Sequence, residues 1–145
     1  ALAGTRATPA SKSAAWRRDP DLRFCRTCYD HLAGQVGIAV TDSLTRQGHL
    51  EPKGPRDWQL TQSGELFCDR LGVDLGTARQ ASSRHFARQC LDWSERRPHI
   101  SGALGAAIAD TFFKRGWAER LRRSRTVRLT DSGRRALGSH FGATV

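Results

Sequence analysis

An internal repeat constrains the fold of this chain more than any other feature of its sequence. Segment 31–51 aligns without a gap with segment 99–119, and seven aligned positions carry the same residue. Segments 60–64 and 129–133 also match, as Leu-Thr-Gln-Ser-Gly and Leu-Thr-Asp-Ser-Gly. A long period that occurs twice is typical of a duplicated unit rather than of a solenoid. Because a unit of roughly 65 residues is marginal alone, we expect the two copies to share one core.

The clearest predicted helix occupies residues 31–47, and its counterpart begins at His99. Apolar side chains recur at every fourth position of both segments, which is typical of a helix with one buried face. These positions are Leu32, Val36, Val40 and Leu44 in the first copy and Ile100, Leu104, Ile108 and Phe112 in the second. Gly48 and Gly116 follow the helices and predict left-handed C-terminal caps.

Each of these helices also carries two glycines three residues apart. They are Gly34 and Gly37 in the first copy and Gly102 and Gly105 in the second. A glycine inside a helix costs about 1 kcal/mol relative to alanine, so four of them need a structural reason. The simplest reason is close packing of the two helices along a glycine and alanine face, about a pseudo-twofold axis. A symmetric homodimer would use the same face equally well.

A short two-strand pattern follows each helix and predicts a β-hairpin. The hairpins cover residues 50–61 and 117–130, and apolar and polar side chains alternate in their outgoing strands. Thr61 and Thr130 stand where the N-cap of the next helix is expected, and a glycine in its first turn permits a tight entry. Helix, hairpin and helix in this order are typical of winged-helix proteins, in which the hairpin is the wing.

The sequence therefore predicts an α+β fold of two tandem winged-helix-like repeats, each of helix, β-hairpin wing and helix, packed as one compact unit. Residues 1–20 are rich in small residues and are expected to form a flexible linker or tail. The first repeat is expected at 21–83 and the second at 84–145. Further helical segments are expected at 21–29 and in the polar connector 77–88.

Basic residues are concentrated in the second half of the chain. The net charge is +10, and residues 79–145 hold 14 Lys and Arg against 5 Asp and Glu, whereas residues 1–78 hold 10 against 9. A half with this excess of positive charge favours an acidic partner, most often nucleic acid. The alternative is an arginine-rich face that is only solvated. No apolar run spans a bilayer and no secretory signal is present, so we expect a cytoplasmic protein without membrane contact. Because the sequence starts at Ala1 and contains no Met, we expect a fragment or a processed product of a longer protein.

Two long motifs resemble one known family. Residues 26–34 read Arg-Thr-Cys-Tyr-Asp-His-Leu-Ala-Gly, and residues 90–107 begin Cys-Leu-Asp-Trp-Ser-Glu-Arg-Arg-Pro-His. Both resemble the C-terminal region of bacterial ArsR/SmtB-type winged-helix transcriptional regulators, from about Leu22 to Gly142. The resemblance implies a repressor whose helix-turn-helix domain precedes this region, with residues 1–20 as linker. This chain, in which no such domain is visible, would be a dimerisation, sensing or auxiliary DNA-contact part.

Cysteine and histidine side chains gather near the start of each copy. The candidate metal ligands are Cys25, Cys28, His31, Cys90 and His99. Thiolate and imidazole together suit Zn²⁺ or another thiophilic metal, and sensors of the family named above often use such thiols. No other cofactor is indicated. The alternative to metal binding is a structural role. In that case the thiols are small buried groups, and the histidine rings bond to the backbone or to Asp30 and Glu95.

Arginine crowds the turn of the second hairpin. The candidate DNA-binding residues are Arg120, Arg122, Arg123, Arg125 and Arg128. A wing of this composition can lie along phosphates or enter a minor groove, and the alternative is a solvated loop. The first wing carries only Lys53 and Arg56, offset by Glu51 and Asp57.

The stretch 92–97 predicts a structural clamp between the copies, an ion-pair cluster beneath Trp93. Its charged members are Asp92, Glu95, Arg96 and Arg97. No nucleophile elbow, phosphate loop or metalloprotease helix occurs, so no enzyme is expected. Two functions remain open. The chain is part of a homodimeric regulator that contacts DNA through the second wing or through an upstream helix-turn-helix domain, or it is a stand-alone metal-binding or protein-interaction module without DNA contact.

Overall fold

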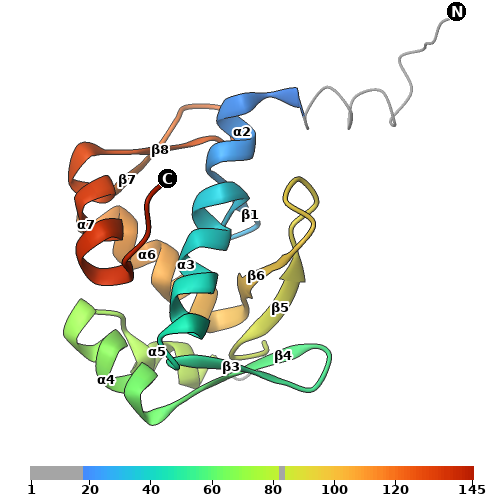
Figure 1. Ribbon diagram of the computed structural model, residues 1–145, viewed down its shortest axis with the longest axis vertical. Coiled ribbons are helices and arrows are strands. Elements are labelled where there is room, and N and C mark those ends of the chain that lie inside the picture. The colour runs from blue at the N-terminus through green and yellow to red at the C-terminus, as the bar shows by residue number, and fades with distance from the viewer. Residues whose placement is uncertain (1–17, 82–83) are drawn as a thin grey trace, which may run out of the picture.

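The computed structural model describes residues 18–81 and 84–145, and has an α+β architecture in which short antiparallel hairpins alternate with helices (Figure 1). The expected linker therefore falls almost wholly outside the described residues. In the first half the elements are α2 (Pro20–Phe24), β1 (Arg26–Cys28), β2 (His31–Ala33), α3 (Gly34–Arg46), β3 (Leu50–Lys53), β4 (Asp57–Leu60), α4 (Gln62–Leu71) and α5 (Leu75–Gln80). In the second half they are β5 (Arg88–Leu91), β6 (Pro98–Ser101), α6 (Gly102–Lys114), β7 (Ala118–Arg120), β8 (Val127–Leu129) and α7 (Asp131–Phe141).

Each half contains the same succession of hairpin, helix, hairpin and helix, and the first hairpin of each half pairs with the second hairpin of the other. β4 joins β5 through the pair Asp57 and Arg88, which completes a sheet of order β3-β4-β5-β6. On the other side, the backbone N–H of Thr27 donates to the carbonyl of Arg125 at 2.9 Å, and that of Val127 donates to Cys25 at 3.0 Å. The two halves are thus interlocked through their backbones.

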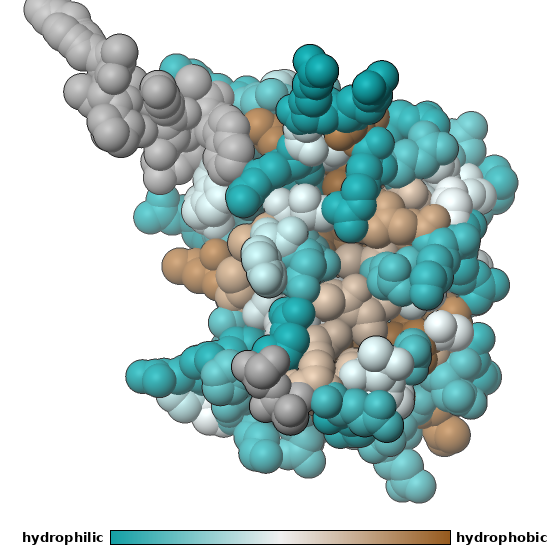
Figure 2. Space-filling model, turned by 180° about the vertical axis from the view of Figure 1, so that it is seen from behind, coloured by the Kyte–Doolittle hydropathy of each residue, from teal (hydrophilic) through white to brown (hydrophobic). Residues whose placement is uncertain are grey.

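One hydrophobic core draws on both halves. It includes Val40 and Leu44 of α3, Leu104 and Phe112 of α6, and Phe141 of α7. The apolar side chains that recur at every fourth position of the two predicted helical segments are all buried. On the face turned away in Figure 1, hydrophilic side chains form the rim around a more hydrophobic centre (Figure 2). No helix among the described residues is long and apolar enough to cross a membrane.

The predicted second hairpin of each half and the helix caps are confirmed. The hydroxyl of Thr61 accepts from the N–H of Gly64 at 3.1 Å, and that of Thr130 accepts from Gly133 at 3.0 Å, at the starts of α4 and α7. Gly48 and Gly116 have φ values of 76° and 71°, so they close α3 and α6 in the left-handed conformation.

Two predictions about the first helices are wrong. The helix expected at 21–29 ends at Phe24, and the helices expected from His31 and His99 begin three residues later, because those histidines lie on strands. Tyr29 (φ 62°) makes the tight turn between β1 and β2, and this left-handed conformation interrupts a helix. The helix expected in the connector 77–88 is also shorter, since α5 ends at Gln80.

The glycines of α3 and α6 do not form the predicted helix-to-helix face. A Cβ on Gly37 would lie 2.6 Å from the carbonyl oxygen of Leu32, and one on Gly105 would lie 2.7 Å from that of Ile100. Each glycine therefore lets its helix pack against the strand that precedes it. Between the halves, α3 packs on β6 and α6 packs on β2.

Helix α7 contains a matched pair of glycines for a stability test. A Cβ on Gly133 would lie 2.0 Å from the carbonyl oxygen of Trp117, whereas one on Gly138 would meet nothing within 4 Å. We expect Gly133→Ala to destabilise the fold by at least about 2 kcal/mol, because backbone would have to move. Gly138→Ala should stabilise it by up to about 1 kcal/mol. Urea unfolding of both variants measures the difference, and equal midpoints would contradict the close approach.

Candidate metal centre

Two hairpins bring together two pairs of cysteine and histidine. Cys28 and His31 are direct partners across the hairpin of β1 and β2, and Cys90 and His99 are direct partners across that of β5 and β6. The hairpins meet where β2 packs against β6. One thiol and one imidazole from each half therefore face the same point of the interface.

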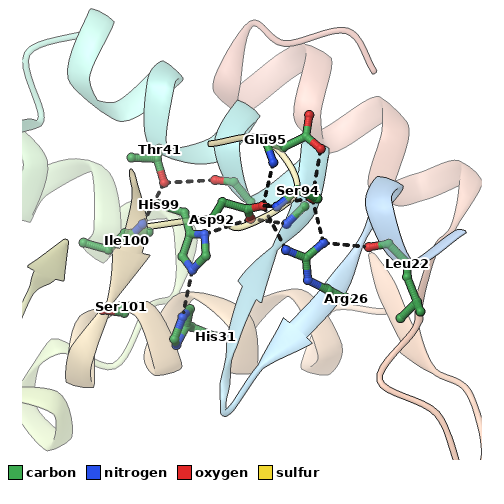
Figure 3. A network of polar contacts seen from close by, with 12 residues as sticks. Leu22, Arg26, His31, Thr41, Asp92, Ser94, Glu95, His99, Ile100 and Ser101 are labelled. Atoms are coloured by element: carbon green, nitrogen blue, oxygen red, sulfur yellow. Dashed lines mark hydrogen bonds and ion pairs between the residues drawn. The ribbon is translucent and has the colours of Figure 1, made fainter. Parts of the chain in front are cut away.

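The four side chains form a compact cluster. The Sγ atoms of Cys28 and Cys90 and one ring nitrogen from each of His31 and His99 lie within 4.8 Å of one another. The two Nε2 atoms are 3.0 Å apart and point toward each other (Figure 3). Both rings are buried, with 5% of His31 and 1% of His99 exposed, whereas both cysteines are only half-buried. The cluster is thus closed on its imidazole side and accessible on its sulfur side.

Hydrogen bonds within the cluster shift the pKa values of the two thiols in opposite directions. The pKa of Cys28 lies well below its ordinary value, because its thiolate accepts hydrogen bonds from Cys90, His31 and His99. The pKa of Cys90 is raised, because its thiol donates to Cys28 and is partly desolvated. The two thiols therefore titrate as a coupled pair, in which Cys28 is the more acidic.

A fully buried carboxylate, Asp92, fixes the ring of His99. Its Oδ2 accepts from His99 Nδ1 at 3.0 Å and from the N–H of Gly34 at 2.6 Å, and its Oδ1 accepts from the N–H of Ser94 and of Glu95 at 3.1 Å each. Burial opposes its charge, but these hydrogen bonds and the nearby Arg26 outweigh burial and hold the pKa of Asp92 well below its usual range. Burial also opposes the charge of His99, yet the bonds to Asp92 and Cys28 raise its pKa.

Arg26 supplies the positive charge that Asp92 needs. Its guanidinium donates to Asp92 Oδ1 at 2.8 Å and to the carbonyl of Leu22, in α2, at 3.0 Å. The same group lies 4.1 Å from the ring centroid of Trp93. With 1% of its surface exposed, Arg26 is among the largest fully buried residues of the chain. The network thus runs from His99 through Asp92 and Arg26 to α2 (Figure 3).

The structure places Cys25 away from the other four candidate ligands. It is 1% exposed and belongs to the hydrophobic core. Burial raises the pKa of its thiol to about 12. The helix expected at 21–29 would have placed Cys25 and Cys28 on one face, but α2 ends at Phe24 and Cys28 lies at the end of the extended strand β1.

The ion-pair cluster predicted within 92–97 is wrong in its pairings. Asp92 pairs with Arg26 instead of the neighbouring arginines, and Arg97 pairs with Asp42 of α3 at 2.6 Å. One signal pointed to this region. Two residues separate Cys28 from His31 and eight separate Cys90 from His99, so the second copy carries an insertion at Asp92.

The five arginines of the second wing are all exposed. Arg128 forms an ion pair with Glu119, and Arg120 lies 4.1 Å from the ring centroid of Phe113. Within the described part of the chain, Arg122 and Arg123 at the tip have no ion-pair partner. The tip therefore presents positive charge to solvent.

The buried carboxylate of Asp92 and the more exposed carboxylate of Asp42 form a matched pair for a stability test. We expect Asp92→Asn to destabilise the fold by about 3–5 kcal/mol, because it leaves the buried Arg26 without its counter-charge. Asp42→Asn removes an exposed pair with Arg97 and should cost less than about 1 kcal/mol. Chemical unfolding of both variants provides the measurement. A cost for Asp92→Asn as small as that of the control would show that the buried pair adds little.

Comparison with known proteins gives one similar sequence. The chain is 43% identical over 125 residues to the uncharacterized HTH-type transcriptional regulator YdfF of Bacillus subtilis strain 168, an alignment that covers 86% of this chain and 54% of that protein. The chain thus spans about half the length of this relative. No family model matches the chain, and no solved structure matches it. By sequence, the chain is therefore similar to part of an HTH-type transcriptional regulator.

Proposed function

We propose that this chain is the C-terminal part of a DNA-binding transcriptional regulator of ArsR type that acts as a repressor. The observation that carries the proposal is the 43% identity to an HTH-type transcriptional regulator of which the chain spans 54%. In this proposal an upstream domain reads DNA, and the present chain serves dimerisation, sensing or auxiliary DNA contact. A homodimer belongs to the same proposal, because helix-turn-helix regulators commonly read two half-sites.

The proposed architecture is a tandem pair of winged-helix-like repeats, at 21–83 and 84–145. The shared succession of elements and the matching threonine caps support it. In a winged-helix reader, the helix before the wing enters the major groove. Here those helices are α3 and α6, and eight residues of α3 and seven of α6 are buried. Helices buried to this extent are unavailable to a groove, which favours base reading elsewhere in the longer protein.

The second wing remains the surface of this chain best suited to DNA. Its five exposed arginines have no counterpart in the first wing, where Lys53 and Arg56 stand beside Glu51 and Asp57. A protruding, cationic hairpin tip can follow the phosphate backbone without reading bases. We therefore assign to it an auxiliary contact that adds affinity rather than sequence preference.

Replacement of Arg122, Arg123 and Arg125 by alanine in the full-length regulator tests this assignment. Each lost phosphate contact reduces the slope of log affinity against log salt by about 0.9, so we expect a slope smaller by up to about 3 and weaker binding. The measurement is a fluorescence titration at several salt concentrations, on random duplex DNA and on fragments that the regulator enriches from genomic DNA.

The matched control replaces Lys53 and Arg56 of the first wing, and should leave the slope nearly unchanged. An unchanged slope in the triple variant would remove the second wing from the DNA interface. Failure of the full-length, unmodified regulator to bind any DNA would instead overturn the proposed function itself.

A second candidate is a metal-binding or protein-interaction module without DNA contact. The four clustered side chains Cys28, His31, Cys90 and His99 favour it. The two functions are compatible if the cluster senses an ion inside a regulator, and the salt titration above distinguishes a module that never meets DNA.

A further inference from the structure

We propose that Cys28, His31, Cys90 and His99 bind one zinc-type divalent ion in a four-coordinate site that joins the two halves of the chain. This inference deepens the second candidate function, on which it rests, and is independent of DNA contact. Two hairpins contribute one cysteine and one histidine each, so the ion would lie between β2 and β6.

The donor set selects the class of ion. Two thiolates and two imidazoles form the Cys₂His₂ set of tetrahedral zinc sites, whereas Mg²⁺ and Ca²⁺ prefer oxygen ligands. In a tetrahedron with Zn–N near 2.05 Å and Zn–S near 2.3 Å, the donors are about 3.3–3.8 Å apart. All four donors already lie within 4.8 Å of one another, and the two Nε2 atoms are 3.0 Å apart. Shifts of a few tenths of an ångström at the rings and somewhat more at the sulfurs complete the geometry.

The proton positions on the two histidines give an independent argument. His99 Nδ1 faces the Asp92 carboxylate at 3.0 Å and so carries a proton, which leaves its Nε2 to meet Nε2 of His31 at 3.0 Å. Only one proton fits between these two nitrogens, so one of them must accept through its lone pair. Nδ1 of His31 is buried without a hydrogen-bond partner in the described structure and lies 3.6 Å from an Asp30 oxygen.

A bound ion would engage both Nε2 atoms through their lone pairs in place of a shared proton. The proton of a neutral His31 then lies on Nδ1, where it faces the Asp30 carboxylate. A second proton on His31 would also satisfy Nδ1, but it adds a positive charge to a ring that is only 5% exposed. A divalent ion with two thiolates and two neutral imidazoles carries no net charge, which suits a mostly buried position.

The surroundings of His99 resemble the outer shell of a metal centre. Metal-bound histidines commonly donate their second ring nitrogen to a carboxylate, which fixes the tautomer and the ring plane. Asp92 accepts this bond and is itself held by Arg26 and by the backbone N–H of Gly34. Asp92 is therefore a positioning residue. The half-buried sulfurs of Cys28 and Cys90 leave a path by which an ion enters.

Titration of the reduced, chelator-treated chain with Co²⁺ tests the site. We expect one Co²⁺ per chain, with the intense visible bands of tetrahedral cobalt and a thiolate-to-cobalt charge-transfer band, both abolished by one equivalent of Zn²⁺. Zn²⁺ at 100 times its dissociation constant should raise the midpoint of thermal unfolding by about 10 °C, since it binds the folded chain selectively.

Matched variants separate the site from adventitious thiol or histidine binding. Cys28→Ser and Cys90→Ser should each weaken Co²⁺ binding at least 100-fold and reduce the charge-transfer band, and His99→Gln should do the same to affinity. Cys68→Ala and His85→Gln remove a thiol and an imidazole outside the cluster and should keep the stoichiometry and spectrum. Circular dichroism confirms that each variant is folded before it is compared.

Three results would overturn the proposal. One is a folded wild-type chain that binds neither Co²⁺ nor Zn²⁺, in which case a proton joins the two histidines. Another is a cobalt spectrum without thiolate bands. The third is undiminished binding in the folded Cys28→Ser/Cys90→Ser double variant, which would place the ion elsewhere.

Discussion

The ion pair between Asp92 and Arg26 is the interaction on which the rest of this structure depends. Both side chains are almost wholly inaccessible to solvent, and they join segments 66 residues apart in the sequence. Taking two charges out of water costs several kcal/mol each, and this cost is offset only if the remaining donors and acceptors are satisfied. Here they are, because backbone N–H groups, His99 and the carbonyl of Leu22 complete the shell. The pair thus specifies one arrangement of β1, β6 and α2.

The interlocked hairpins give this arrangement its rigidity. The first hairpin of each half forms backbone hydrogen bonds with the second hairpin of the other half. The helices α3 and α6 therefore pack on strands of the opposite half rather than on each other. Glycine is required where a helix approaches the carbonyl groups of its own hairpin, at Gly37 and Gly105. The result is one core in which neither half keeps its contacts when separated from the other.

Local signals in the sequence predict the second hairpin and second helix of each half well. The Leu-Thr-x-x-Gly segments specify a cap and a tight entry through neighbouring residues only, and both occur as predicted. The first hairpins escape prediction because their strands are three or four residues long and their apolar spacing continues into the helices. The pairing of Asp92 with Arg26 could not be predicted, because no local pattern indicates a contact between two residues that are 66 positions apart. Cys25 precedes Cys28 by the same three residues that separate Cys28 from His31, but the chain is extended there and Cys25 lies in the core.

The two sides of the cluster differ in a way that bears on its chemistry. The second copy carries the insertion at Asp92, which gives His99 a buried carboxylate partner, while His31 faces the half-exposed Asp30 at 3.6 Å. Arg88 occupies the hairpin position equivalent to Arg26, yet it meets only a partly exposed Asp57 at 3.9 Å. The surroundings of the two pairs have therefore diverged, whereas a cysteine opposite a histidine is present in both. If the four side chains served packing alone, apolar residues would fill the same volume without the cost of an unpaired ring nitrogen. Their joint presence on two otherwise different hairpins is most simply explained by a shared ligand.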